Sequence, residues 1–411
     1  MHELASADGP PRHAGRWLLD PEVVMLNHGS FGACPRVVLE AQQEFRLQME
    51  REPVRFFFRE REPLLDAARK ALARLLGAAP DDLVFVRNAT EGVNAVLRSL
   101  RFAQGDELLV TDHAYNACRN VVEYVARASG ARVVVAQVPM PIEAEDEAVD
   151  ALLSAASDRT RLAMIDHVTS PTALVWPIAR IVRLLADQGI DTLVDGAHAP
   201  GMIPLDIDRI GAAYYTGNCH KWLCCPKGAG FLHIRGDRQE AVRPAIISHG
   251  YNTIRAERGR LFEEFDWAGT VDPTPWLCLP AALRFLEGLF GGIGGLMRHN
   301  HLLAVEARHI LCEALGAQPP CPEAMLGAMA AVPLWHDDTA GANVFRCHPL
   351  QDRLLEEFGI EAPVYHWPGP PRLWVRVSAQ AYNSVEQYRR LAGALARLRP
   401  SIKAGSGRDG G

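Results

Sequence analysis

The 411-residue sequence lacks the long apolar runs and the charge excess that mark membrane proteins and nucleic-acid-binding proteins. No apolar run is long enough to span a bilayer, and the first residues, MHELASADGPPRHAGRW, lack the apolar core of a secretion signal. We therefore expect a cytoplasmic protein. A net charge of −6 gives no electrostatic reason to expect nucleic acid or an anionic membrane as a partner.

Sequence motifs for metals, nucleotides and serine hydrolases are missing as well. The nine cysteines are scattered without a C-x-x-C pair, and there is no H-E-x-x-H, so we expect packed thiols and no metal site. There is no G-x-x-x-x-G-K-[ST], and the run GGIGGL at Gly291 lacks the third glycine of a dinucleotide fingerprint. No G-x-S-x-G elbow occurs in the body of the chain.

What the sequence does contain is a regular alternation of strand-like and helical runs. LLDAARKALARLLG has a helical period and stops at Gly77. Strands are predicted at DLVFV, ELLVT, RVVVAQV, RLAMIDHV, DTLVDGAH and AAYYTG, with helices between them. Repeated β-α-β units predict the α/β class, with a mostly parallel sheet covered by helices on both faces.

The pattern changes after about Pro275. A helix-rich stretch there leads to the alternating run RLWVRVS and to a final helix over roughly Ser384 to Arg399. We predict an N-terminal segment over residues 1–25, a large domain over 26–275, a small α+β domain over 276–400 and a tail over 401–411. The first ~14 residues and the tail are rich in Gly, Pro, Ser and charge and are expected to be disordered.

Polar side chains follow five of the predicted strands. Ligands of open parallel sheets bind beyond the carboxyl ends of the strands, so these side chains are expected to share one crevice. In chain order they are Asn88, Thr90 and Glu91; Asp112, His113 and Tyr115; His167, Thr169 and Ser170; Asp195 and His198; and Lys221.

Three of these residues together point to one chemistry. Asp195 ends an apolar strand, where a carboxylate needs a cationic or hydrogen-bonding partner. Lys221 follows another strand in an apolar setting, which lowers the pKa of an amine and frees it as a nucleophile. A lysine for an imine and an aspartate for a pyridinium nitrogen are the groups that hold pyridoxal phosphate. Thr90 opens a helix whose first N–H groups suit the phosphate.

Each residue also has an ordinary explanation when it is taken alone. Asp195 could cap the turn before Pro200, Thr90 could be a helix cap, and Lys221 could be a surface lysine. The order Thr90, Asp195, Lys221 on separate strand ends is what favours the cofactor site.

The motifs also resemble those of a known family. The chain is similar to the class V aminotransferases, which are fold-type I pyridoxal-phosphate enzymes, and within them to the isopenicillin N epimerase-like branch. The motifs that carry the resemblance are LNHGSFGACP, NATEGVN, TDHAYNACR, VDGAHAPG, TGNCHKWLCCPKGAGFL and RVSAQAYN. They span Leu26 to Asn383 in the order of the family. A large cofactor-binding domain over 26–275 is implied.

The resemblance implies roles around the cofactor. Lys221 would hold it as a Schiff base and move protons on one face, Asp195 would pair with the ring nitrogen, and His198 would lie near the phenolic oxygen. His113 and Tyr115 compete for the place stacked on the ring, with Tyr115 favoured, and both are catalytic candidates. The residues expected to contact the cofactor are Ala89, Thr90, Tyr115, Ser170, Asp195, His198, Asn218, His220, Lys221 and Thr270.

Further roles concern the substrate and a partner chain. Arg376 would bind the substrate carboxylate as a planar two-pronged donor, with a simple salt bridge as the alternative. Asn27 and His28 are further substrate-binding candidates. Relatives place a G-T pair from a second subunit at the phosphate, and AGT, which ends at Thr270, implies a homodimer.

Three functions remain open. The first is an epimerase or related aminotransferase that acts through an external aldimine at the α-carbon of an amino acid. The second is a C–S or β-lyase acting on a cysteine conjugate or sulfoxide, with His28 or His366 as the acid at the leaving group. The third is a catalytically decayed regulatory protein.

PVYHWPGPPR lacks the cysteine that desulfurases carry before the arginine, which argues against desulfurase activity. Arg55, Phe56 and His366 are candidates for side-chain specificity.

Overall fold

The computed structural model of the chain describes residues 13–338 and 346–399. The segments predicted to be disordered lie almost entirely outside these ranges. No helix within the described ranges has both the length and the hydrophobicity needed to cross a bilayer.

The described chain contains three sheets and the helices that pack on them. The strands are β1 (Val24–Met25), β2 (Leu83–Val86), β3 (Glu107–Thr111), β4 (Arg132–Ala136), β5 (Thr160–Asp166), β6 (Asp191–Gly196), β7 (Tyr214–Asn218), β8 (Gly230–Ile234), β9 (Met329–His336), β10 (Ile360–Glu361), β11 (Val364–His366) and β12 (Arg372–Ser378). The α-helices are α1 (His28–Phe31), α2 (Arg36–Arg51), α3 (Pro53–Arg55), α4 (Arg61–Leu76), α5 (Ala89–Ser99), α6 (Asn116–Ser129), α7 (Glu145–Ala155), α8 (Ile178–Ala186), α9 (Ile207–Ile210), α10 (Arg260–Phe265), α11 (Thr274–Leu277), α12 (Leu279–Glu287), α13 (Ile293–Leu315), α14 (Pro349–Phe358) and α15 (Val385–Leu398).

The largest sheet has seven strands in the order β2-β8-β7-β6-β5-β3-β4. Only β8 runs against its neighbours, and the pairs from β7 through β4 are all parallel. The mostly parallel α/β fold predicted from the alternation is therefore confirmed. Because these strands are parallel, the segments after β3, β5, β6 and β7 emerge at the same edge of the sheet.

Helices cover both faces of this sheet, because its strands are apolar on both sides. On one face, Val93 and Val96 of α5 and Val122 of α6 pack against Leu108 and Leu193 of the sheet. On the other face, a core formed largely by α4, α7, α8 and α12 packs against alternate residues of the same strands. The predicted helix over LLDAARKALARLLG ends as expected, because Gly77 adopts a left-handed φ of +60°.

A smaller three-stranded sheet, β11-β12-β9, lies in the C-terminal part of the chain. Val375 and Val377 of β12 face the apolar core against α13 and α15, while Arg376 faces the other way, because successive side chains of a strand alternate between its two faces. The N-terminal segment joins this part, because β1 pairs in parallel with β10. The domain boundaries given above stay a prediction.

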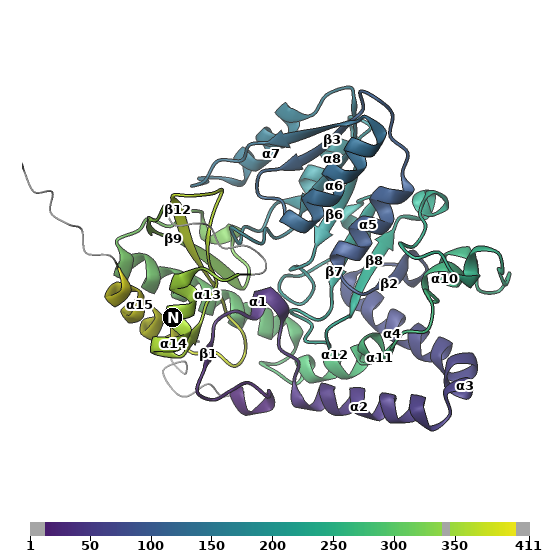
Figure 1. Cartoon of the computed structure of the whole chain (residues 1–411), viewed down its shortest axis with the longest axis horizontal. Helices are drawn as coiled ribbons and strands as arrows, with labels where there is room; N and C mark the ends of the chain where they lie inside the picture. Colours follow the sequence, from purple (N-terminus) through teal and green to yellow (C-terminus); the bar gives the residue numbers. More distant parts are fainter. Residues whose placement is uncertain (1–12, 339–345, 400–411) are drawn as a thin grey trace, which may run out of the picture.

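The turn that follows β1 connects the two parts of the molecule. Figure 1 shows α1 between the region of β9 and β12 and the region of β7. The Gly29 N–H donates to Ser378 Oγ at 2.9 Å, and the Lys221 carbonyl is 3.0 Å from His28 Nε2. At Gly32, with a φ of +72°, an added Cβ would lie 2.0 Å from the His220 carbonyl oxygen. The backbone of this turn therefore rests directly on the segment that carries Lys221.

This close approach predicts that Gly32→Ala destabilises the protein more than an alanine at a glycine of similar φ. A left-handed alanine costs ~1–2 kcal/mol by itself, and the steric clash with His220 adds ~1–3 kcal/mol. Gly259→Ala is the matched control, because Gly259 has a φ of +78° and nothing within 4 Å of an added Cβ. Denaturant unfolding of both variants, with cofactor affinity as a second readout, measures the difference. Equal losses of stability in both would contradict the contact.

Candidate active site

Lys221 lies directly after β7, held in a loop whose neighbours Cys219 and Trp222 are buried. Its Nζ is 3.2 Å from Nε2 of His198. Burial, together with the nearby positive charge of Arg376, lowers the pKa of Lys221 to about 8. The segment after β7 therefore holds an amine that loses its proton near neutral pH, as a nucleophile requires.

The hydrogen bonds of His198 fit a neutral lysine. The Trp222 indole N–H donates to His198 Nδ1 at 3.5 Å, so Nδ1 carries the lone pair and Nε2 carries the proton. Burial and the neighbouring charge of Lys221 lower the pKa of His198 well below its usual value. The Nε2–H of a neutral His198 therefore donates to the lone pair of the Lys221 amine.

Asp195 lies near the end of β6, next to Thr216 of β7 in the register of the sheet. Its Oδ1 accepts the Ala197 N–H at 3.0 Å, and its Oδ2 accepts the Cys118 S–H at 3.0 Å. A carboxylate with two hydrogen-bond donors is held in one orientation with its charge stabilised.

Asp166 of β5 is the register partner of Asp195, so two buried carboxyl groups lie side by side. Burial and the negative charge of Asp195 raise the pKa of Asp166 well above its usual value. Burial also raises the pKa of Asp195, but its hydrogen bonds with Cys118 and Ala197 oppose this. Asp166 Oδ2 has no hydrogen-bond partner in the described chain. We infer that Asp166 keeps the proton while Asp195 carries the charge. Asp166 and Cys118 were not among the residues predicted from the sequence.

The N-terminus of α5 meets the end of β7. Asn88, rather than Thr90, caps the helix, because its side chain accepts the Glu91 N–H. The Ala89 N–H donates to Asn218 Oδ1 at 2.9 Å. Thr90 is half-buried in the first turn.

Two contacts hold the helix and the lysine loop in place. A Cβ at Gly92 would lie 2.2 Å from Thr216 Oγ1, so α5 packs against β7 with no room for a side chain at position 92. The Nδ1 of His220 bonds to the Ala229 carbonyl at 3.0 Å, which fixes this ring beside Lys221.

Arg376 of β12 is buried with only neutral oxygen partners. Its Nη1 donates to the Ser170 carbonyl at 2.6 Å and to Ser170 Oγ at 3.1 Å, and its Nη2 donates to Ser30 Oγ at 3.0 Å. Among the described residues its Nε has no hydrogen-bond partner, and the terminal nitrogens contact only oxygens of Ser170 and Ser30, none of them a carboxylate. The salt-bridge alternative therefore finds no support, and a buried cation without a counter-ion suits an anionic ligand.

His113 and Tyr115 lie in different environments. His113 is fully buried, with Nδ1 bonded to Thr172 Oγ1 at 2.7 Å and Nε2 bonded to the Val138 carbonyl at 3.2 Å. Tyr115 is the N-cap residue of α6 and is 39% exposed. Burial and the charges of Cys118 and Asp195 raise the pKa of the Tyr115 phenol, while Arg376 lowers it.

Several other candidates are engaged elsewhere. His28 is fully buried, with Nδ1 bonded to Tyr382 Oη at 2.9 Å and Nε2 bonded to the Lys221 carbonyl, and burial lowers its pKa to about 3. His28 therefore holds the loop that carries Lys221 through the hydrogen bond to the Lys221 carbonyl. Thr169 Oγ1 bonds to Thr172, and Ser170 bonds to Arg376. Thr270 lies exposed between α10 and α11.

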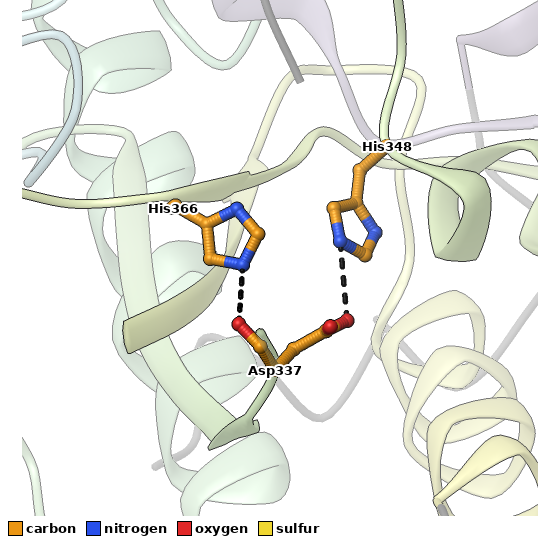
Figure 2. Close-up of side chains that lie close together, drawn as sticks. All are labelled: Asp337, His348 and His366. Atoms are coloured by element: carbon orange, nitrogen blue, oxygen red, sulfur yellow. Dashed lines mark hydrogen bonds and ion pairs between the residues drawn. The ribbon is translucent and has the colours of Figure 1, made fainter. Parts of the chain in front are cut away.

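The candidates for side-chain specificity also have other surroundings. Phe56 is fully buried in the main core, whereas Arg55 pairs with Glu60 at 2.6 Å on the surface. His366 belongs to a cluster with Asp337 and His348, the one group of metal-ligand type found among the described residues (Figure 2).

In this cluster, hydrogen bonds engage the histidine ring nitrogens that face Asp337 and that a metal ion would need as ligands. The Leu350 N–H donates to His348 Nδ1 at 3.1 Å, so Nε2 carries the proton that faces Asp337 Oδ2 at 3.2 Å. His366 Nε2 donates to the Asp337 carbonyl at 2.9 Å. Both histidines thus turn an N–H toward Asp337, and a metal ligand must present a lone pair instead. The cluster joins the ends of β9 and β11 to the start of α14.

The lysine amine, the carboxylate on the neighbouring strand and the helix N-terminus define a fold-type I pyridoxal-phosphate enzyme. The chain belongs to the aminotransferase class-V family, whose model matches residues 26–319, and pyridoxal phosphate is its cofactor. The family resemblance expected from the motifs is confirmed.

Two curated relatives cover most of the chain. It is 37% identical over 394 residues to isopenicillin N epimerase of Streptomyces clavuligerus, covering 93% of this chain and 96% of that one. It is 35% identical over 399 residues to a probable chloroplastic L-cysteine desulfhydrase of Arabidopsis thaliana, covering 92% and 83%.

A solved structure shows the same fold. The cystine C–S lyase C-DES, in complex with its reaction product cysteine persulfide, has a TM-score of 0.76. The match covers 92% of this chain and 99% of that one at 23% identity.

The donor set of this chain fits the cofactor. Lys221 supplies an amine of lowered pKa, and Asp195 supplies a buried carboxylate held in one orientation. The first turn of α5, which carries Thr90 and the positive end of the helix dipole, meets the end of β7, where an anion is stabilised.

Proposed function

We propose that this enzyme is an epimerase of the isopenicillin N epimerase type, which inverts the α-carbon of an amino-acid substrate. The observation that carries the proposal is the placement of two proton-transfer groups on opposite sides of β6. Lys221 follows β7 and Tyr115 follows β3, while β6, with Asp195, lies between them in the sheet. Inversion requires that a proton leave one face of the α-carbon and that another arrive on the opposite face.

The residues that would hold the cofactor are those at the strand ends. Lys221 would bind it covalently, Asp195 would face the ring nitrogen, and His198 would face the phenolic oxygen. Thr90, Asn218 and His220, with the Ala89 backbone, would surround the phosphate. When bound, pyridoxal phosphate supplies an electron sink that makes the α-proton of an amino acid acidic.

The side chains then divide the remaining tasks. Arg376, a buried cation without a carboxylate partner among the described residues, binds the substrate carboxylate and so orients the α-carbon. The neutral Lys221 amine takes the α-proton on its side. Tyr115, whose raised pKa keeps the phenol protonated, returns a proton on the other side. Stacking of Tyr115 on the ring, rather than His113, is part of this proposal.

A C–S lyase is the second candidate, because relatives named L-cysteine desulfhydrase match over 92% of the chain. Such a reaction also needs Lys221 to take the α-proton, but it then releases a sulfur group from the β-carbon. The two histidines considered for that step are engaged elsewhere, His28 with Lys221 and Tyr382, and His366 with Asp337. A thiolate leaves readily without an acid, so the lyase needs a direct test.

Proton NMR in heavy water separates these functions. Cofactor-loaded enzyme is given isopenicillin N and L-cysteine, the compounds named for the relatives. Exchange of the α-proton with formation of the opposite epimer is the expected result. Tyr115→Phe should still exchange the proton on the Lys221 side, yet lose at least ~10²-fold in epimer formation, the lower range for an acid–base group. Release of pyruvate and sulfide from L-cysteine, without inversion of either compound, would contradict the epimerase and support the lyase.

We also propose that the enzyme is a cytoplasmic homodimer in which Thr270 of one chain reaches the phosphate of the other. Thr270 is exposed and follows Gly269, whose φ of +104° shapes the loop. Sedimentation of the loaded enzyme tests the dimer.

A further inference from the structure

Arg376 is connected to a circuit of hydrogen bonds that runs through four other segments of the chain. The circuit starts at the Val364 N–H of β11, which donates to Gln351 Oε1 at 3.1 Å. Gln351 Nε2 donates to Glu361 Oε1 at 2.9 Å, and Asn27 Nδ2 donates to the same oxygen at 3.2 Å. Ser30 Oγ donates to Asn27 Oδ1 at 2.5 Å, and Arg376 Nη2 donates to Ser30 Oγ at 3.0 Å. β12, which carries Arg376, pairs with β11 and closes the circuit.

The direction of every bond in this circuit is determined chemically. A backbone N–H only donates, so Gln351 must present its oxygen to Val364 and its amide N–H to Glu361. The Glu361 oxygen that receives it only accepts in this arrangement, so Asn27 must present its amide N–H there. Asn27 Oδ1 is then left to face Ser30, whose hydroxyl must donate to it.

The consequence reaches the guanidinium of Arg376. Because the Ser30 proton points to Asn27, a lone pair of Ser30 Oγ is left for Arg376 Nη2. Ser170 holds Nη1 through two oxygens. The guanidinium is a planar group, so fixing both terminal nitrogens also fixes the direction of the unpartnered Nε–H.

We propose that Glu361 is a positioning residue that orients the substrate-binding Arg376 through Asn27 and Ser30. The proposal rests on the proposed function, in which Arg376 binds the carboxylate of the substrate. It also changes the role expected for Asn27, which acts on the substrate through Ser30 and Arg376. Glu361 was not a sequence candidate, because it belongs to the two-residue strand β10 and its partner Asn27 is 334 residues away.

The test uses two aminooxy reagents on cofactor-loaded enzyme. Aminooxyacetate and O-methylhydroxylamine both condense with the aldehyde carbon of the cofactor and release the Lys221 amine, which changes the absorbance of the bound cofactor. Only aminooxyacetate carries a carboxylate for Arg376. The ratio of their second-order rate constants therefore measures carboxylate recognition without any knowledge of the natural substrate.

We expect a high ratio for the wild type and a low ratio for Arg376→Gln. Glu361→Ala should lower the ratio roughly ten-fold, the effect of losing about one hydrogen bond to a charged group. Glu361→Gln should keep the wild-type ratio within about two-fold, because its amide oxygen accepts from the same two donors. Glu357→Ala, a surface change in α14, is the control, since Glu357 pairs with the exposed Arg353 of the same helix. Ser30→Ala removes the last link without altering the β1–β10 pair, and should match Glu361→Ala.

The outcomes separate this inference from the proposed function. Equal ratios for wild type and Arg376→Gln would overturn carboxylate binding by Arg376 itself. A low ratio for Arg376→Gln with a wild-type ratio for folded Glu361→Ala and Ser30→Ala would overturn the positioning role alone. A low ratio for Glu361→Gln would overturn the directional circuit, because the charge of Glu361 would then be responsible. Circular dichroism and thermal unfolding confirm that each variant is folded.

Discussion

Replacement of Lys221 by alanine abolishes covalent attachment of pyridoxal phosphate and lowers turnover by at least ~10²–10⁴-fold, the range for loss of a general acid–base group. The reason is that the Lys221 amine, with a pKa of about 8, is both the group that binds the cofactor and the group that takes the α-proton. Borohydride reduction followed by peptide mass spectrometry measures the attachment. The chain has only four lysines, at positions 70, 221, 227 and 403, so the modified site is unambiguous.

Lys227→Ala is the matched control for this experiment. Lys227 lies in the same loop, but its Nζ donates to the Gly32 carbonyl at 2.9 Å instead of facing His198. This variant should keep the covalent cofactor. Cofactor mass found on Lys227 or Lys70 in the wild type would show that the site is elsewhere.

Replacement of Asp195 by asparagine lowers turnover by roughly 10²–10³-fold, the range for loss of one preorganised electrostatic group. Asparagine keeps the shape of the side chain but removes the charge that faces the ring nitrogen in our proposal. The same charge attracts the ammonium form of Lys221 and raises its pKa, whereas Arg376 lowers it. Without Asp195 the pKa of Lys221 therefore falls below about 8, so the amine is neutral over a wider pH range.

The rate of acylation of Lys221 in the cofactor-free chain is measured against pH. The midpoint of this profile gives the pKa of Lys221. Asp191→Asn is the control. Asp191 is the first residue of β6, at the opposite end of the strand from Asp195, and it pairs with Arg238 at 2.7 Å. Its midpoint should equal that of the wild type. An unchanged midpoint in Asp195→Asn would mean that Asp195 carries no charge and that the charge belongs to Asp166 instead.

The large sheet was predictable because its signals are local. Apolar strand runs, helical periods and Gly77 each depend on a few neighbouring residues, and the structure reproduces them. The convergence of Lys221 and Asp195 was predictable too, because parallel strands deliver their ends to one edge.

Side-chain direction was not predictable in the same way. His113, His28 and His366 all lie within the quoted sequence stretches, yet each directs a ring nitrogen to a partner supplied by a distant segment. Asp166 was missed because its importance comes only from register pairing with Asp195. Glu361 was missed because its partner Asn27 is 334 residues away.

The turn around His28 also has a consequence for synthesis on the ribosome. His28 and its partner Tyr382 are 354 residues apart, so the N-terminal turn emerges long before the residues that complete its contacts. During translation this early segment must wait while the central sheet folds, because contacts between distant residues form late. A nascent chain released before residue 382 would thus hold the turn and the Lys221 segment without the Tyr382 hydroxyl that bonds to His28.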